Sequence, residues 1–105
     1  MSEVIWSRAA ERSLQDIRNF IARDNPEAAD RIVTGILDQA DMLGDFPRLG
    51  PRHYQDYEQS GQTGQHVRSI RYGSYRIGYT IRPDGGVEIL SVQHTPRRQG
   101  GFPFY

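Results

Sequence analysis

The chain has no cysteine and no lysine among its 105 residues, and it has no long apolar run. The missing cysteine excludes disulfides, thiolate zinc sites and cysteine nucleophiles. No apolar stretch approaches the roughly 20 residues that a membrane-spanning helix needs. The opening stretch, MSEVIWSRAAERS, lacks the apolar core of a signal peptide. We therefore expect a cytoplasmic protein that makes no contact with a membrane.

All 13 basic residues are arginine, and their distribution is uneven. One explanation is recognition of an anion, because a planar guanidinium matches the geometry of a carboxylate or phosphate. The other is the codon bias of a GC-rich genome, which favours arginine over lysine. Residues 1–45 hold 5 Arg and 9 acids, a net charge of −4, whereas residues 46–105 hold 8 Arg and 4 acids, a net charge of +4. The basic second half suggests an acidic or anionic partner.

Residue patterns predict one strand and two helices in the first half of the chain. The β-branched and aromatic run 4–6 is typical of a strand. Ser7 suits the N-cap of a helix that reaches about residue 23, and Asn25 suits the cap of the next helix. Gly44 is the expected end of the second helix. Because the link between the two helices is short, they should form an antiparallel hairpin.

The stretch RSIRYGSYRIGYTIR, residues 68–82, predicts a β-hairpin. Gly73 and Ser74 suit a type II′ turn between strands at about 66–72 and 75–82, and a second turn at 84–86 leads to a strand at 87–93. Residues 45–66 form a long polar connection with no regular period. The order β-α-α-β-β-β predicts a single α+β domain over 1–105, with a helical hairpin packed on a mostly antiparallel four-stranded sheet.

Alternation along residues 75–82 separates an apolar face from an arginine face. With a period of two, Tyr75, Ile77, Tyr79 and Ile81 share one face, and Arg76 lies on the other with Arg82. Tyrosines between basic residues can stack on nucleic-acid bases. Core packing is the better interpretation for Tyr75 and Tyr79. The role of Tyr72, at the turn, stays open between base stacking and core packing.

Five segments, in order, resemble toxins of the RelE/ParE superfamily from bacterial type II toxin–antitoxin modules. The opening strand with Trp6 and the following helix is similar to the start of these toxins. DNPEAADRI and FPRLG resemble the link into the second helix and the motif that closes it. RYGSYRIGYTI resembles the central hairpin, and ILSVQHTPRR the last strand with its basic exit. DNPEAA and FPRLG are more similar to the ParE branch.

The resemblance implies a growth-arresting toxin, of the kind encoded in plasmid stabilisation modules, that a cognate antitoxin silences. ParE-like members inhibit DNA gyrase by binding it, and this is the favoured function, without enzymatic chemistry. RelE-like members cut mRNA on the ribosome, which is the alternative. A degenerate, non-toxic binding module is the third interpretation. None of the three requires a cofactor or sequence-specific DNA binding by the toxin alone.

The candidate site residues follow from these alternatives. A nuclease would need a cation over the phosphate together with a general acid and base. Arg76 has the position of the phosphate-stabilising arginine of RelE-like toxins, but the lysine pair of those nucleases is absent. A solvated charge or an antitoxin ion pair is the simpler role for Arg76, and a structural hydrogen bond the simpler role for His94. The candidate nuclease residues are Arg76, His94, Arg97 and Tyr105.

The arginine-bearing strand face and the tail are the expected surface for the antitoxin, through a disordered acidic or amphipathic segment that folds on binding. The three histidines, His53, His66 and His94, are too far apart in sequence to suggest a metal site. The predicted partner-binding residues are Arg68, Arg71, Arg76, Arg82, Arg97 and Arg98.

Overall fold

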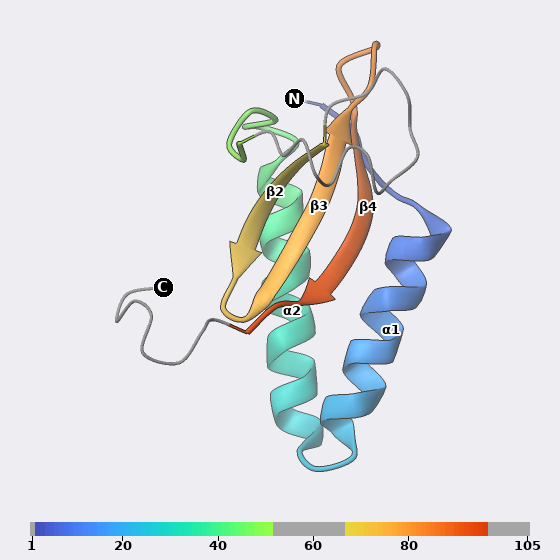
Figure 1. Cartoon of the computed structure of the whole chain (residues 1–105), viewed down its shortest axis with the longest axis vertical. Coiled ribbons are helices and arrows are strands. Elements are labelled where there is room, and N and C mark those ends of the chain that lie inside the picture. Colours follow the sequence, from blue (N-terminus) through green and yellow to red (C-terminus); the bar gives the residue numbers. More distant parts are fainter. Residues whose placement is uncertain (1, 52–66, 97–105) are drawn as a thin grey trace.

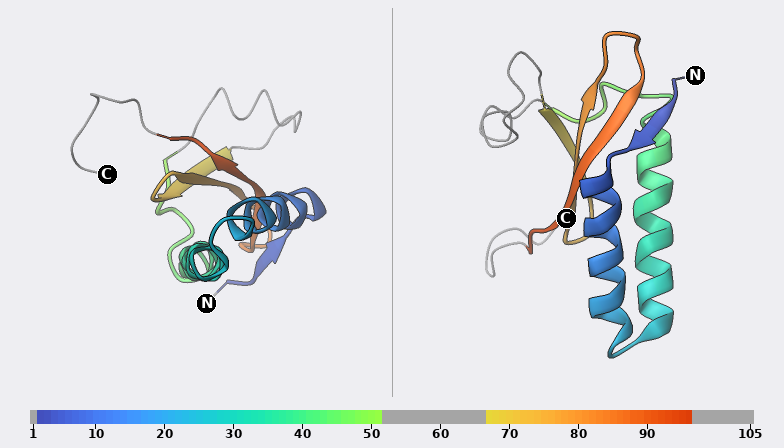
Figure 2. Two further views of the ribbon diagram at one scale, coloured as in Figure 1. Left: turned by 90° about the horizontal axis from the view of Figure 1, so that it is seen from below. Right: turned by 90° about the vertical axis from the view of Figure 1, so that its right-hand side faces the viewer.

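A computed structural model of the chain describes residues 2–51 and 67–96, and the predicted α+β fold is confirmed (Figure 1). The helices form an antiparallel hairpin that covers one face of a four-stranded sheet, as the side view in Figure 2 shows. No helix in the described ranges is long and apolar enough to cross a membrane. In chain order, the elements are β1 (Val4–Trp6), α1 (Arg8–Ala22), α2 (Pro26–Met42), β2 (Val67–Tyr72), β3 (Tyr75–Ile81) and β4 (Val87–His94).

The strand order in the sheet is β1-β4-β3-β2. The three C-terminal strands form an antiparallel meander, and β1 adds to its edge parallel to β4, with Val4 opposite Val87. The register between β3 and β4 shifts after Gly78, where the β4 partner changes from Ser91 to Ile89. Because of this irregularity, Val87 and Ile89 face the helices together with Val92, although Ile89 and Val92 are three positions apart.

Polar side chains cap both helices as expected. The Ser7 hydroxyl accepts the Ala10 N–H at 3.0 Å, and the Asn25 side chain accepts the Ala28 N–H at 3.0 Å. These bonds satisfy backbone donors that the first helical turn leaves free. Ser7 also donates to the Leu90 carbonyl at 3.3 Å, so the same side chain fastens the start of α1 to β4.

The second helix ends at Met42, just before Gly44, as the sequence predicted. Leu43 caps α2 in the ordinary right-handed conformation, and Gly44 has no positive φ. A Cβ on Gly44 would lie 2.7 Å from the Ser2 carbonyl oxygen. The predicted end of the helix is therefore confirmed, and glycine is needed here because the N-terminal segment passes close to its backbone.

The core lies between the helical hairpin and the sheet. Tyr79 and Ile77 are completely buried in it, and Tyr75 and Ile81 pack against it half-buried. Tyr72 also faces the helices. Its ring lies against Gly35 of α2, in the space that a Cβ at that position would occupy. The strand tyrosines thus serve as core residues, which confirms that interpretation for Tyr75 and Tyr79 and decides it for Tyr72.

Glycine permits both hairpin turns. Gly73 has φ +58°, and Ser74 after it has no positive φ, as the predicted type II′ turn requires. In the β3–β4 turn, Gly85 has φ +89°. Neither conformation suits a residue with a Cβ.

Candidate functional site

Two predicted arginines lie side by side on the sheet face that points away from the helices. Arg71 of β2 is the register partner of Arg76 of β3, and Arg76 is in turn opposite Gln93 of β4. Arg76 Nη2 donates to Gln93 Oε1 at 3.2 Å, and Arg71 Nη2 donates to the Thr95 carbonyl oxygen. On this face, Arg71, Arg76 and Gln93 form one row of polar side chains across β2, β3 and β4, near the β2–β3 turn.

The remainder of this face is not an open basic surface. Val67, Ser69 and Thr80 belong to it by register, and each is almost fully buried. Within β2 and β3, the arginines of this face therefore lie at one end, in the row of Arg71 and Arg76.

Arg68 belongs to the opposite face, which corrects the expectation that it extends the arginine face. Its register partner is Tyr79, so its side chain lies on the helix side of the sheet. Arg68 Nη1 donates to the Gly50 carbonyl at 2.7 Å. The structure thus gives Arg68 a partner within the fold, and its role toward a second protein stays a prediction.

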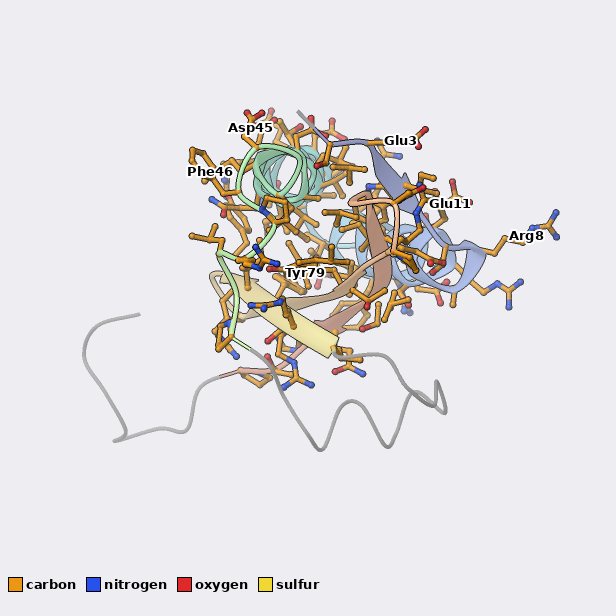
Figure 3. The ribbon with its side chains drawn as sticks, turned by 90° about the horizontal axis from the view of Figure 1, so that it is seen from above. Glu3, Arg8, Glu11, Asp45, Phe46 and Tyr79 are labelled. Carbon is orange, nitrogen blue, oxygen red and sulfur yellow. The ribbon has the colours of Figure 1, made fainter. Side chains whose placement is uncertain are left out.

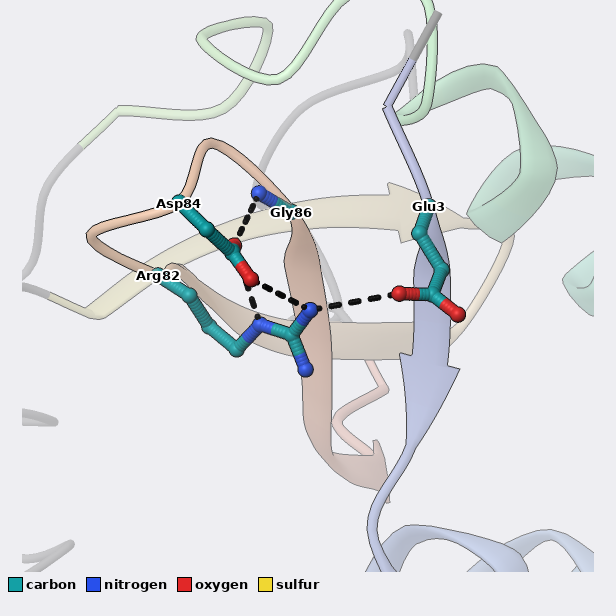
Figure 4. Close-up of polar contacts among 4 residues, drawn as sticks. All are labelled: Glu3, Arg82, Asp84 and Gly86. Atoms are coloured by element: carbon teal, nitrogen blue, oxygen red, sulfur yellow. Dashed lines mark hydrogen bonds and ion pairs between the residues drawn. The ribbon is translucent and has the colours of Figure 1, made fainter.

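Arg82 lies in a cluster of charges beyond the end of β3 (Figure 4). Its Nη2 is 3.3 Å from a Glu3 oxygen and 3.0 Å from an Asp84 oxygen. Asp84 also accepts the Gly86 N–H at 2.8 Å, and this bond, helped by Arg82, lowers the pKa of the Asp84 carboxyl. Partial desolvation opposes the charged form of Arg82, but the two carboxylates outweigh it and its pKa is raised. Arg82 therefore fastens β1 to the β3–β4 turn.

The candidate nuclease residues Arg76 and His94 lie on opposite faces of the sheet. His94 is the register partner of Tyr75, and the two rings lie with centroids 5.1 Å apart, tilted by 45°. Tyr75 and Arg76 are consecutive in β3, so their side chains point to opposite faces. The two side chains are therefore not placed to act on one phosphate group from the strands that carry them.

Three predicted site residues, Arg97, Arg98 and Tyr105, fall outside the described residues, as do His53 and His66. Within 2–51 and 67–96, histidines and carboxylates form no group of three that could hold a metal ion. On the face away from the helices, the described part of the site consists of Arg71 and Arg76 with Gln93 beside them.

A feature that the sequence did not reveal is the anchoring of residues 46–50 by Tyr79. The Tyr79 hydroxyl donates to the Pro47 carbonyl at 2.7 Å and accepts the Gly50 N–H at 2.9 Å. Burial raises the pKa of Tyr79, although the Gly50 bond and Arg68 act in the other direction. In Figure 3, Tyr79 lies inside the molecule, and Phe46 projects outward at its margin. The hydrogen bonds of Tyr79 to the backbone at Pro47 and Gly50 thus hold Phe46 and Leu49 at the surface.

The fold defines a class of small α+β proteins. It is similar to a solved chain from the chromosomal ParDE toxin–antitoxin system of P. aeruginosa, with a TM-score of 0.66 over 90% of this chain and 97% of that one. The two sequences are 19% identical, so this likeness concerns the fold.

Sequence comparison then gives the family. Residues 4–98 match the family of ParE toxins of the type II toxin–antitoxin system parDE, and the chain belongs to this family. It is 34% identical to Y4kP of Sinorhizobium fredii, a candidate toxin by its name, over 85% of this chain and 83% of that protein. It is 28% identical to toxin RelE2 of Caulobacter vibrioides, over 92% of this chain and 99% of that toxin. The predicted RelE/ParE resemblance is confirmed.

Proposed function

We propose that this ParE-family toxin arrests growth by binding DNA gyrase, without bond-breaking chemistry of its own. The match to ParE toxins over residues 4–98 carries the proposal, because ParE-like members are the gyrase-directed branch of the superfamily. The cytoplasm, where gyrase acts, is the proposed location.

The arrangement of the candidate nuclease residues supports a binding function. Arg76 and His94 lie on opposite faces of the sheet. The chain contains no lysine, so it lacks the lysine pair that RelE-like nucleases use. General acid–base catalysis needs its groups within hydrogen-bond reach of one reacting centre. A protein-binding surface has no such requirement.

The test is a DNA supercoiling assay with purified gyrase and purified toxin. We expect micromolar toxin to inhibit supercoiling and to leave relaxation by a type I topoisomerase unchanged. Folded toxin that leaves gyrase fully active at these concentrations would contradict the proposal.

The RelE-like alternative makes a different prediction, since its mechanism depends on Arg76. Mapping mRNA ends after induction of the toxin should then reveal cleavage at fixed codon positions. We expect no such pattern, and we expect Arg76→Ala to remain toxic. Codon-positioned cleavage that Arg76→Ala abolishes would instead establish the nuclease.

We further propose that an antitoxin neutralises this chain. The structural neighbour belongs to a ParDE toxin–antitoxin system, and the basic second half of this chain suits an acidic partner. Co-purification with the product of the adjacent reading frame tests the partnership. Growth arrest without that product, and growth with it, would distinguish a toxin from a non-toxic binding module. A plasmid that carries both genes should then be lost less often.

A further inference from the structure

The segment that follows α2 carries an apolar hollow at the surface. Phe46 and Leu49 are 59% and 51% exposed, and the half-buried Ile81 lies beside them. A lone exposed apolar side chain is ordinary, but a group of them marks an interaction site. The hollow has a volume of about 500 Å³ and is lined by Phe46, Pro47, Arg48, Leu49, Ile81 and Gly85.

This apolar hollow is held in a fixed shape. The Tyr79 hydroxyl bonds to Pro47 and Gly50, and Arg68 donates to the Gly50 carbonyl. Gly50 lies so close to β2 that a Cβ on it would be 2.3 Å from the Ser69 carbonyl oxygen. Because the exposed side chains sit on an anchored backbone, little ordering entropy is lost when a partner binds there.

The charge around the hollow indicates the partner's chemistry. Arg48 is exposed, and among residues 2–51 and 67–96 it is the only charged one that lines the hollow. Asp45 precedes Phe46 but does not line the hollow, and Figure 3 shows it pointing away from Phe46. An occupant that complements these walls carries apolar side chains and at least one carboxylate.

We propose that the apolar hollow receives a short amphipathic segment of the antitoxin, with its apolar side chains in the hollow and a carboxylate on Arg48. The inference rests on the proposed toxin function and adds a surface that is separate from the row of Arg71 and Arg76. A volume of about 500 Å³ accepts a few side chains, whereas two folded domains in a stable complex bring roughly 20–30 residues of each partner into the interface. Amphipathic segments insert their apolar side chains into grooves in this manner.

The experiment measures the affinity of toxin variants for the purified product of the adjacent reading frame. We expect Phe46→Glu combined with Leu49→Glu to weaken binding by roughly 30-fold or more, as loss of a central apolar anchor does. Arg48→Glu should weaken it by about 10-fold, because it places like charges together. Phe20→Glu is the matched control, since Phe20 is 68% exposed on α1 and does not line the hollow. It should change the affinity less than about 2-fold.

Growth arrest separates the possible outcomes. We expect the double variant to remain toxic and to escape neutralisation, which would also show that it folds. Unchanged antitoxin affinity in the double variant and in Arg48→Glu would overturn the proposed surface and leave the partnership intact. Loss of toxicity with full antitoxin binding would assign the hollow to the cellular target and overturn the inference. Failure of the wild-type chain to bind the adjacent product would overturn the partnership as well.

Discussion

Tyr79 connects the core to the surface. Its ring is completely buried beneath the helices, and its hydroxyl bonds to two backbone groups of residues 46–50. A buried hydroxyl needs such partners to offset the loss of water. One side chain thereby fixes the segment that carries the exposed apolar side chains of Phe46 and Leu49.

Replacing Tyr79 by phenylalanine should therefore destabilise the protein. The change keeps the ring and leaves the buried Gly50 N–H without its acceptor, which costs about 1–3 kcal/mol of unfolding free energy. Urea unfolding measures this loss. Tyr75→Phe is the matched control, because the Tyr75 hydroxyl makes no hydrogen bond to the described residues, and an equal loss in both variants would contradict the role given to Tyr79.

At the scale of elements, α2 and β2 approach each other closely where Tyr72 meets Gly35. The Tyr72 ring lies against Gly35, and a Cβ there would be 2.1 Å from Tyr72 Cζ. The absence of a side chain in the middle of the helix lets the strand's tyrosine pack against the helix backbone.

We expect Gly35→Ala to destabilise the protein by about 1–3 kcal/mol, because the added methyl group displaces the Tyr72 ring. In an unobstructed helix the same change stabilises by about 1 kcal/mol. A double-mutant cycle with Tyr72→Ala, measured by urea unfolding, should restore that gain. Stabilisation by Gly35→Ala in the wild-type background would show that the contact is unimportant.

The elements themselves could be predicted from the sequence, since periodicity, caps and turn glycines are local signals. Arg68 and Arg71 lie on opposite faces of the sheet because they are three positions apart in one strand, and their shared role toward a partner stays a prediction. The separation of His94 from Arg76 depends on the β3–β4 register, which no local pattern fixes. The bonds of Tyr79 join segments about 30 residues apart and left no signal in either.

At the scale of the whole molecule, the Arg82 cluster fastens the first strand to the last turn. Glu3 precedes β1, and its ion pair with Arg82 joins residues 79 positions apart, whereas Asp84 pairs with Arg82 inside the turn between β3 and β4. The cluster is largely exposed, and salt should weaken it.

The lowered pKa of Asp84 predicts a loss of stability in acid. Because the folded-state pKa is below the ordinary value of 3.8, the stabilisation is present above that value and is lost as the pH falls through the folded-state pKa. We expect the melting temperature of Asp84→Asn to fall less steeply below pH 4 than that of the wild type. Parallel curves for the two proteins would contradict this assignment.

The parallel pairing of β1 with β4 also bears on when the toxin becomes complete during synthesis. Val4 pairs with Val87, so β1 waits for its partner while the intervening residues are translated, on the order of ten seconds. A nascent chain that stops before Val87 lacks β4, the strand with which β1 pairs. Interrupted translation would then release a chain that lacks β4 and leaves the β1 backbone without its partner strand.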